Sequence, residues 1–562
     1  MKLRITTNQT VLSRDVFKLV PTIAFKLGLF WLLIVALSIN AHAQSPNGVS
    51  PISKSAPGSE PINPAHPFVN PPKNEEPKPT DRERALLERI DQLEKRLVEV
   101  ESLVKKTSPT EVKESASAQS ELAANNVPSA PIESPAQDQP AKKKKAEPFA
   151  FADWTWLSGN PRTKEVPLDS KFFTPEIRFD VNYTSSFNHP QDNTIGGSSE
   201  IFRSGEFQLT QLGLGGDFHY DNVRGRVMTQ IGMYSQTQPR NDPSTARGQW
   251  QLDNAYRYVS EASGGYHIDK LHGINVDAGI FLSYIGLWSF YNFDNWTYQP
   301  SFVSSNTPWF FNGLRIQIFP SDKLKIEPWL INGWQSYGKF NRAPGVGGQI
   351  AWRPNGKVAF VFNNYWGKDT LNNPGRKRIH TDDSVQVKYY DNQENWISKG
   401  AFTFTLDAGC EYGGGVSCSG SSDSPAQYFL GFMAYNRFWF KKDKFALTLG
   451  GGAITNPGRY LVLLPPINGA TAFSGTPYFT ANPGDSFRGI DGSVTFDYMP
   501  SQYITFRSEY NHRASNVPYW SGKGGITPPG GNVGPLGSFV PGFTPDLVKQ
   551  ERRFTLAILV KY

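Results

Sequence analysis

Short and long connections alternate without exception through the C-terminal part of the sequence. From Phe172 onward, segments in which apolar and polar residues alternate are joined by seven short polar links and eight long segments. Outer-membrane barrels have short turns at one end, long loops at the other and an even number of strands, whereas a soluble sandwich has no reason to sort its connections in this way. The pattern therefore predicts an all-β fold: an antiparallel transmembrane β-barrel of about sixteen strands over residues 172–562. The short links are 220–223, 269–273, 320–323, 353–357, 391–395, 441–444 and 499–502, and the long segments are 187–204, 237–250, 285–307, 337–345, 368–379, 410–426, 457–484 and 516–549.

The last twelve residues predict the strand that closes this barrel. Phe554, Leu556, Ile558, Val560 and Tyr562 occupy every second position, so they share one face of an extended chain. A final apolar strand that ends on an aromatic residue resembles the C-terminal signal of bacterial outer-membrane barrels. We therefore predict that these five residues form an assembly signal for the barrel-assembly machinery, and that their strand pairs with the first one.

The composition suits a barrel better than a soluble enzyme or a disordered chain. Only 38% of the residues are hydrophobic, yet the sequence holds 14 Trp, 23 Tyr and 38 Phe. A transmembrane barrel needs apolar residues on only one side of each strand, so its mean hydropathy is unremarkable. The formal charge of +7 is spread along the chain, which gives no reason to expect a nucleic-acid partner. We expect the outer surface to contact outer-membrane lipid and lipopolysaccharide.

The N-terminal 43 residues resemble a secretory signal peptide. Basic residues precede an apolar run at 27–39, and Ala41-His42-Ala43 forms an A-x-A cleavage site. The run is shorter than the roughly 20 residues that a spanning helix needs, although a retained membrane anchor is the alternative. We therefore expect export to the outer membrane of a Gram-negative bacterium.

Three further segments of changing composition precede the predicted barrel. Residues 44–80 are rich in Pro, Ser and Asn, and residues 107–171 form a second low-complexity linker that contains four consecutive lysines at 142–145. Residues 81–106 between them carry a heptad seam, which predicts a coiled-coil helix in a periplasmic extension and a homo-oligomer, with a trimer as the expected state. A single amphipathic helix packed on the barrel is the alternative. The lysines either meet anionic lipid or cell-wall polymer or form a solvated linker. The seam consists of Leu86, Ile90, Leu93, Leu97, Val100 and Val104.

Charged residues on the polar phase of the predicted strands are candidates for the channel lining. A barrel of sixteen strands leaves a water-filled lumen, and its selectivity depends on the side chains that line and narrow it. Basic residues slightly outnumber acidic ones on this phase, which favours a weak anion preference, although opposed charges also brace barrel walls. The candidates are Arg178, Arg224, Arg226, Arg257 and Arg315.

The third long segment, residues 285–307, is the candidate constriction. It contains Trp288, Tyr291, Asp294, Trp296 and Tyr298. In porins of this size the third outer loop often folds into the lumen, and aromatic faces beside carboxylates would suit the passage of saccharides. The alternative is that these aromatic residues belong to the interface girdle or pack the loop against the wall.

The remaining residues with chemical potential predict a disulfide and no catalysis. Cys410 and Cys418 lie in one long segment, and an exported protein is expected to pair them. The eight histidines are scattered, and none falls in a recognisable motif, so we expect no enzyme, no cofactor and no metal site. Pro328 interrupts a strand at 323–335 and predicts a β-bulge there.

Residues 255–366 resemble the OmpL-like "putative β-barrel porin-2" family. The similar residues are Gly279, Ser283 and Gly286, the aromatic run 291–302, and the sequence WLINGW at 329–334. The resemblance implies a porin fold and passive transport. We therefore predict an outer-membrane porin for the passive diffusion of small hydrophilic solutes. The alternative is a structural or adhesive protein whose outer loops bind ligands and whose extension tethers the cell wall.

Overall fold

The computed structural model describes residues 147–562 with gaps, together with Lys95. The gaps are 163–165, 197, 199, 240–241, 243–247, 289, 340, 371–372, 423–424, 459–485 and 530–541. The predicted signal peptide, the Pro-rich linker and most of the coiled coil lie outside the described residues. Lys95, within the predicted coiled coil, is helical and exposed.

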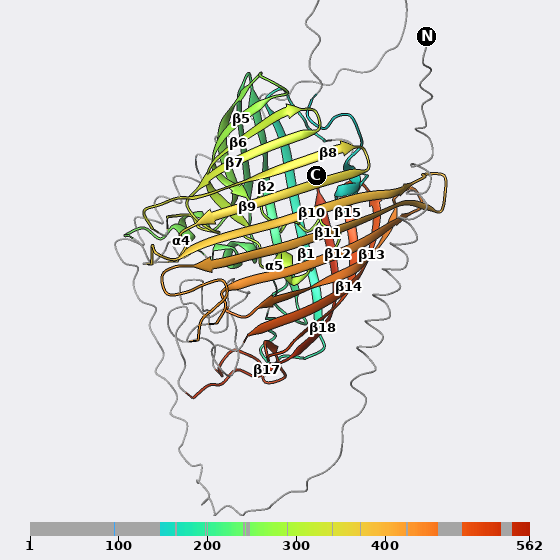
Figure 1. Ribbon diagram of the computed structural model, residues 1–562. Coiled ribbons are helices and arrows are strands. Elements are labelled where there is room, and N and C mark those ends of the chain that lie inside the picture. The colour runs from blue at the N-terminus through green and yellow to red at the C-terminus, as the bar shows by residue number, and fades with distance from the viewer. Residues whose placement is uncertain are drawn as a thin grey trace, which may run out of the picture. The chain divides into compact units, whose positions relative to one another are not determined.

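Sixteen strands of the described chain form a closed barrel in which every neighbouring pair is antiparallel (Figure 1). Each strand follows its predecessor around the ring, and the last one, β18, returns to β1. The predicted all-β barrel of sixteen strands is therefore confirmed. The strands are β1 (Phe173–Ser186), β2 (Phe207–Tyr220), β3 (Val223–Thr229), β4 (Val259–Ile268), β5 (Ile274–Leu282), β6 (Phe310–Ser321), β7 (Leu324–Ile331), β8 (Gly345–Asn355), β9 (Val358–Gly367), β10 (Lys377–Asp391), β11 (Ile397–Tyr412), β12 (Tyr428–Phe440), β13 (Phe445–Asn456), β14 (Phe487–Ser501), β15 (Ile504–Ser515) and β18 (Gln550–Lys561).

The few other elements are short and lie between the barrel strands or before them. They are η1 (Thr155–Leu157), α3 (Tyr234–Thr237), α4 (Leu252–Tyr256), α5 (Phe302–Ser305), β16 (Trp520–Ser521) and β17 (Leu547–Val548). In the described part of the chain, no helix is long and apolar enough to cross a membrane.

The C-terminal strand closes the ring as its alternation predicts. β18 pairs with β15 on one side and with β1 on the other, where Arg178 lies opposite Lys561 and Ser186 lies opposite Arg553. Phe554 is 41% exposed on the outer face of the barrel, while Arg553 beside it is fully buried inside. The period of two thus separates a lipid-facing side from an inward side.

The two ends of the barrel differ in the length of their connections. All seven predicted short links fall between consecutive strands at one end, which we term the short-turn end, and the long segments connect strands at the other. The C-terminus also lies at the short-turn end, because Tyr562 pairs with Ile177 near the start of β1.

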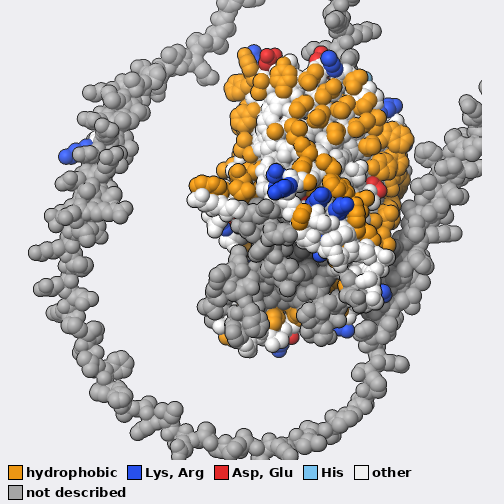
Figure 2. Space-filling view, turned by 60° about the vertical axis from the view of Figure 1, so that its left-hand side comes forward, with side chains coloured by type: hydrophobic (Ala, Val, Ile, Leu, Met, Phe, Trp, Pro, Cys, Tyr) orange, Lys and Arg blue, Asp and Glu red, His pale blue; other side chains and the backbone are white. Residues whose placement is uncertain are grey.

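Apolar side chains cover much of the outer wall, as Figure 2 shows. These residues alternate along the strands with buried polar residues, which therefore point inward. The exposed apolar residues include Leu214, Val227, Leu330, Ile350, Phe362, Leu406, Leu430, Val494, Phe506, Leu556 and Ile558.

Pro328 is accommodated without the predicted β-bulge. It lies in β7 opposite Gly348 of β8, in an unbroken register. On its other side, pairing with β6 is interrupted and resumes in the same register at Ile326. A proline has no amide hydrogen to donate, so the ladder loses local pairing there while the strand keeps its course.

Candidate functional site

The segment between β5 and β6 crosses the interior of the barrel. We term residues 283–309 the inner loop. Every residue from 290 to 309 except Asp294 is buried. The amide of Gly286 lies 3.2 Å from Asp382 of β10, and the Tyr291 hydroxyl donates to Glu261 of β4 at 2.8 Å. Because β4 and β10 are far apart around the ring, the loop passes through the lumen.

Three buried arginines hold the inner loop by its backbone carbonyls. Arg507 of β15 donates to the carbonyl oxygens of Asn292, Asn295 and Thr297 at 2.7–2.9 Å. Arg437 of β12 donates to Trp296 at 3.0 Å, and Arg513 of β15 donates to Pro300 at 2.6 Å. A loop inside a barrel has carbonyls that neither water nor a neighbouring strand satisfies, and a guanidinium offers five donors to such groups. We term Arg437, Arg507 and Arg513 the anchoring arginines.

Asp497 of β14 offsets part of the positive charge of this arrangement. Its two carboxylate oxygens accept from Arg437 at 2.6 Å and from Arg507 at 2.7 Å, and all three side chains are fully buried. A buried ion pair is costly to break because the remaining charge is left without water or partner. The geometry therefore fixes both guanidinium groups beneath the loop.

Carboxylates on the same wall bind the amides of the inner loop. Glu509 accepts from the backbone amides of Tyr298 and Gln299 at 2.7 and 2.9 Å. Asp491 accepts from the amide of Phe302, at the start of α5, at 2.7 Å. Donors and acceptors of the loop are thus both satisfied by charged groups of the wall, which makes these bonds stronger than neutral ones.

The predicted aromatic residues of the loop pack against the protein. Trp288 contacts Tyr435 with ring centroids 4.6 Å apart, and Trp296 contacts Trp439 at 5.6 Å. The Tyr298 hydroxyl donates to Asp180 at 2.7 Å. These rings are buried and present no free face to a sugar. Packing of the loop against the wall, the alternative to sugar stacking, therefore describes their arrangement.

Arg178, Tyr291 and Asp294 are brought together where the loop meets β1. The Arg178 guanidinium lies 4.0 Å from the centre of the Tyr291 ring and 2.8 Å from the Asp294 carboxylate. Lys561 approaches the other Asp294 oxygen at 3.2 Å. Burial alone would raise the pKa of the Asp294 carboxyl, but Arg178 and Lys561 outweigh burial and lower that pKa to about 2.

A second group of arginines keeps contact with solvent. Arg224 pairs with Asp277 at 3.2 Å, and Arg315 pairs with the same carboxylate at 3.1 Å. Arg226 pairs with Glu176, Asp217 and Glu261 at 2.9–3.0 Å. Their side chains are 35%, 20% and 20% exposed for Arg224, Arg315 and Arg226. We term Arg224, Arg226 and Arg315 the open-wall arginines, and each has a carboxylate partner that offsets its charge.

Arg257 was predicted to line the channel from a strand, and the structure contradicts this position. It follows α4 in the long segment before β4 and does not lie on a strand. Its guanidinium donates to Asn254 at 3.4 Å and lies 5.6 Å from the centre of the Tyr258 ring. The short helical turn interrupts the alternation that had suggested an earlier start of the strand.

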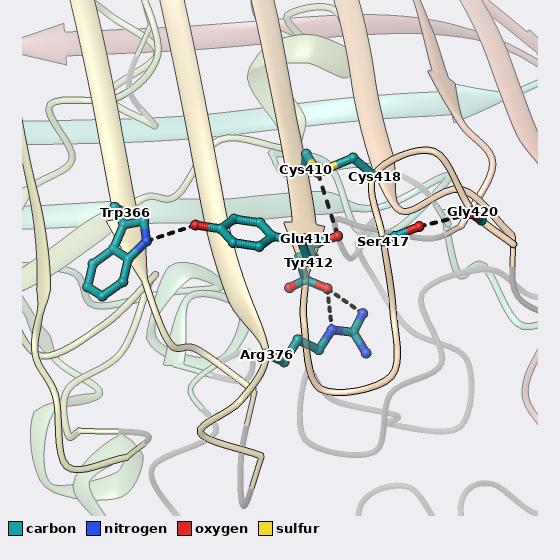
Figure 3. The surroundings of a disulfide bond; sticks show 8 residues. All are labelled: Trp366, Arg376, Cys410, Glu411, Tyr412, Ser417, Cys418 and Gly420. Atoms are coloured by element: carbon teal, nitrogen blue, oxygen red, sulfur yellow. Dashed lines mark hydrogen bonds and ion pairs between the residues drawn. A yellow bond between two sulfur atoms is a disulfide. The ribbon is translucent and has the colours of Figure 1, made fainter.

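Cys410 and Cys418 form the predicted disulfide at the long-loop end (Figure 3). Cys410 lies within β11 and only Cys418 lies in the loop beyond it, so the bond ties the loop to the strand. Glu411, next to Cys410, pairs with Arg376 and with Arg378, the latter at 3.0 Å.

The candidates predicted for the channel lining do not include the anchoring arginines Arg437 and Arg513. Arg437 lies in an aromatic stretch of β12 and Arg513 lies near the end of β15. Arg437 shares the phase of Tyr435, and Arg513 shares the phase of Arg507, so an assignment of strand phase could have placed both inside. Among the described residues, no group of three or more His, Cys, Asp or Glu side chains is arranged to hold a metal ion.

Several solved structures of outer-membrane proteins are similar to this chain. The outer-membrane expressed OmpT of Vibrio cholerae is 10% identical, with a TM-score of 0.40, and the match covers 71% of this chain and 100% of that one. The outer membrane channel DcaP of Acinetobacter baumannii is 11% identical, with a TM-score of 0.39 and coverage of 70% and 96%. An anion-selective porin from Comamonas acidovorans is 10% identical, with a TM-score of 0.40 and coverage of 69% and 99%. No curated protein matches the sequence.

The family comparison covers most of the barrel. The family described as "Putative beta-barrel porin-2, OmpL-like" matches residues 179–538. This span is more than half of the chain and runs from β1 into the segment that precedes β18. The chain therefore belongs to this family of porin-like outer-membrane β-barrel channels.

Proposed function

We propose that the protein allows small hydrophilic solutes to diffuse passively across the outer membrane, with the inner loop as the constriction. The observation that carries the proposal is the contrast between the two groups of arginines. The anchoring arginines are buried beneath the loop, whereas the open-wall arginines remain 20–35% exposed. A solute would therefore pass beside the loop, along the inner face of β3 to β6.

The charges along this path favour weak selectivity. Arg224 and Arg315 share Asp277, and Arg226 meets three carboxylates. The potentials of the two opposite charges in a pair largely cancel. Salt screens what remains beyond a Debye length of about 8 Å at physiological ionic strength. We therefore propose a path for solutes of either sign, and we assign no particular solute to it.

We further propose that the short-turn end faces the periplasm. Short periplasmic turns and long outer loops are the rule for such barrels. The C-terminus lies at this end, and so does residue 173, where β1 begins. The export signal at 1–43, the assembly signal at 554–562 and a periplasmic extension at 44–171 are part of the same proposal.

Self-association through residues 81–106 completes the proposed assembly. The heptad seam supports a homo-oligomer, with a trimer as the proposed state. Comparison of the oligomeric state of full-length protein with that of a variant lacking 81–106 tests this part. An identical state for both would remove the seam as the cause of association.

Single-channel recording of the refolded protein in a planar bilayer tests the porin function. We expect discrete conductance steps, and larger steps when residues 285–307 are replaced by a short Gly/Ser link. Arg203→Ala is the control, because the Arg203 side chain is 41% exposed and lies in another loop. Its steps should equal those of the unmodified protein. Absence of steps from the unmodified and loop-replaced proteins would contradict a porin. Equal steps from both would remove the loop from the constriction.

A further inference from the structure

A segment before the first strand lies across the short-turn end of the barrel. We term residues 147–162 the mouth strap. The sequence places it in the predicted linker 107–171, yet it contains Phe149, Phe151, Trp154 and Trp156, and Trp156 is fully buried. A solvated linker has no reason to bury a tryptophan, so this part of the linker is packed on the barrel.

The mouth strap begins at the turn between β6 and β7. The amide of Phe149 donates to the carbonyl of Asp322 in that turn at 2.7 Å. The Arg353 guanidinium of β8 lies 4.4 Å from the centre of the Phe149 ring and 4.6 Å from that of Trp154. The indole of Trp154 also donates to the Phe149 carbonyl at 2.9 Å. The first residues of the strap are thus fixed to one side of the rim.

A local turn then directs Trp156 into the barrel. The Asp153 carboxylate accepts from the amide and the hydroxyl of Thr155 at 2.9 and 2.7 Å, which is the geometry of an Asx-turn. This turn starts η1. Trp156 belongs to the same buried apolar cluster as Trp296 of the inner loop and Trp439 of β12.

Gly159 joins the strap to the inner loop and to an anchoring arginine. Its amide donates to the Asp294 carbonyl at 2.8 Å, and its own carbonyl accepts from Arg437 at 2.7 Å. A Cβ atom at this position would lie 2.3 Å from the Asn295 carbonyl oxygen and 2.6 Å from that of Phe293. Only glycine allows this approach, so the strap and the loop are fitted to each other.

The strap ends at the turn between β14 and β15. Asn160 donates to the carbonyl of Ser501 at 3.1 Å, and Arg162 donates to the carbonyls of Met499 and Pro500 at 2.6 and 3.0 Å. β6 and β14 stand eight places apart in a ring of sixteen strands. The strap therefore runs between opposite sides of the rim, across the opening.

We propose that the mouth strap is a second constriction, which narrows the short-turn opening and positions the inner loop through Gly159. The inference rests on the proposed porin function and adds to it a set of residues outside the barrel strands. Arg437 binds the carbonyls of Gly159 and Trp296 at once, so it holds strap and loop in one arrangement. Removal of the strap opens the mouth and leaves the loop with fewer partners.

Deletion of residues 147–162 from the otherwise complete chain is the first test. Single-channel conductance is expected to rise on the order of twofold, because pore width at the constriction sets conductance, and larger sugars should enter in liposome swelling. The folded state is followed by the heat-dependent shift in gel mobility. Conductance equal to that of the unmodified protein, with the barrel folded, would overturn the proposal.

Gly159→Val tests the same contact without shortening the chain, and it decides the matter if the deletion variant fails to fold. Its side chain would collide with the inner loop, so a higher or fluctuating conductance is expected. Gly264→Val is the matched control, because a Cβ at Gly264 on the outer face of β4 meets nothing within 4 Å, and its conductance should not change. Equal conductance of the two valine variants would refute the proposal.

Comparison with the unmodified protein distinguishes refutation of the proposed role of the mouth strap from refutation of the proposed porin function. If the unmodified protein conducts and neither strap variant differs from it, only the role of the strap is refuted. If the unmodified protein is silent and the deletion conducts, the strap is supported as a complete block and open passive diffusion through the intact protein is refuted. Silence of all the proteins would refute both.

Discussion

The anchoring and the open-wall arginines both point into the barrel, but they differ in how much of each side chain is exposed to solvent. Both groups lie on the inward phase of strands, and Arg437 and Arg507 pair with a carboxylate as the open-wall arginines do. Arg437 and Arg507 have no exposed side-chain surface, whereas Arg224 is 35% exposed. The difference comes from what faces them: the inner loop covers β12 to β15, and solvent reaches β3 and β6.

This contrast shows that charge on the inward phase does not by itself identify a channel lining. Arg437 and Arg507 serve as donors to the carbonyls of a loop that cannot form a strand of its own. Arg224, Arg226 and Arg315 pair instead with side-chain carboxylates. The first group should therefore govern stability, and the second should govern ion flow.

Arg437→Ala is expected to have the largest effect on stability. It would leave Asp497 and two carbonyls short of a buried donor, and removal of one partner of a buried ion pair typically costs about 3–5 kcal/mol. The free energy of unfolding, measured by urea titration of protein refolded in detergent, should fall by about this amount.

Arg224→Ala is the matched control from the open wall. Its ion pair is partly hydrated, so the same titration should show a loss of about 1 kcal/mol or less. A loss of similar size for Arg224→Ala and Arg437→Ala would show that the two groups do not differ as described.

Asp294→Asn should produce a smaller, pH-dependent effect. The Asp294 pKa is lowered from 3.8 to about 2 in the folded protein, so its carboxylate stabilises the fold at pH above about 4. That contribution is lost as the pH falls from about 4 to 2, because the unfolded state then binds the proton first. The unfolding free energy of the unmodified protein should drop by about 1–2 kcal/mol more than that of the variant across this window.

The control for this measurement is Asp192→Asn in the loop between β1 and β2, away from Arg178 and Lys561. Hydrogen bonds from Thr527 and Ile526 also lower the pKa of the Asp192 carboxyl, against the effect of burial. The acid dependence that the Asp192 carboxyl contributes should persist in the Asp294→Asn protein and be lost in the Asp192→Asn protein. Identical acid profiles for unmodified and Asp294→Asn proteins would contradict the assigned ion pairs.

Arg224→Gln should change ion selectivity with the smallest change in stability. Arg224→Gln removes one positive charge beside Asp277. The reversal potential under a KCl gradient should therefore shift in the direction of greater cation preference, and the shift should be larger at low salt than at high salt. Arg203→Gln at the long-loop rim serves as the comparison and should leave the potential unchanged. Equal shifts from both variants would place the ion path elsewhere.

The strands and turns could be predicted because their signals are local. Alternation with period two and the lengths of the breaks are set by a few neighbouring residues, so all seven short links are where the sequence predicts them. The predicted β-bulge at Pro328 and the predicted strand position of Arg257 were wrong, also for local reasons. An unpaired stretch of ladder accommodates the proline, and a single helical turn precedes β4.

The interior could not be predicted in the same way because its contacts join distant parts of the chain. Arg437 and Gly159 are 278 residues apart, and Arg507 lies more than 200 residues from the carbonyls that it binds. The aromatic residues of the inner loop suggested sugar binding, yet their partners on β1 and β12 bury them. A glycine in a linker gave no sign of the close approach that Gly159 makes.

Accessibility of introduced cysteines tests most directly whether the solute path follows the open wall. The two native cysteines are joined in a disulfide, so a single added thiol is the only reactive one. Ser263→Cys lies on the inward phase of β4 opposite Arg226, and Thr495→Cys lies fully buried beneath the inner loop. With a charged, water-soluble thiol reagent added during recording, the current of Ser263→Cys should change within the exposure, and that of Thr495→Cys should stay constant. Rapid modification at 495 with none at 263 would contradict the account.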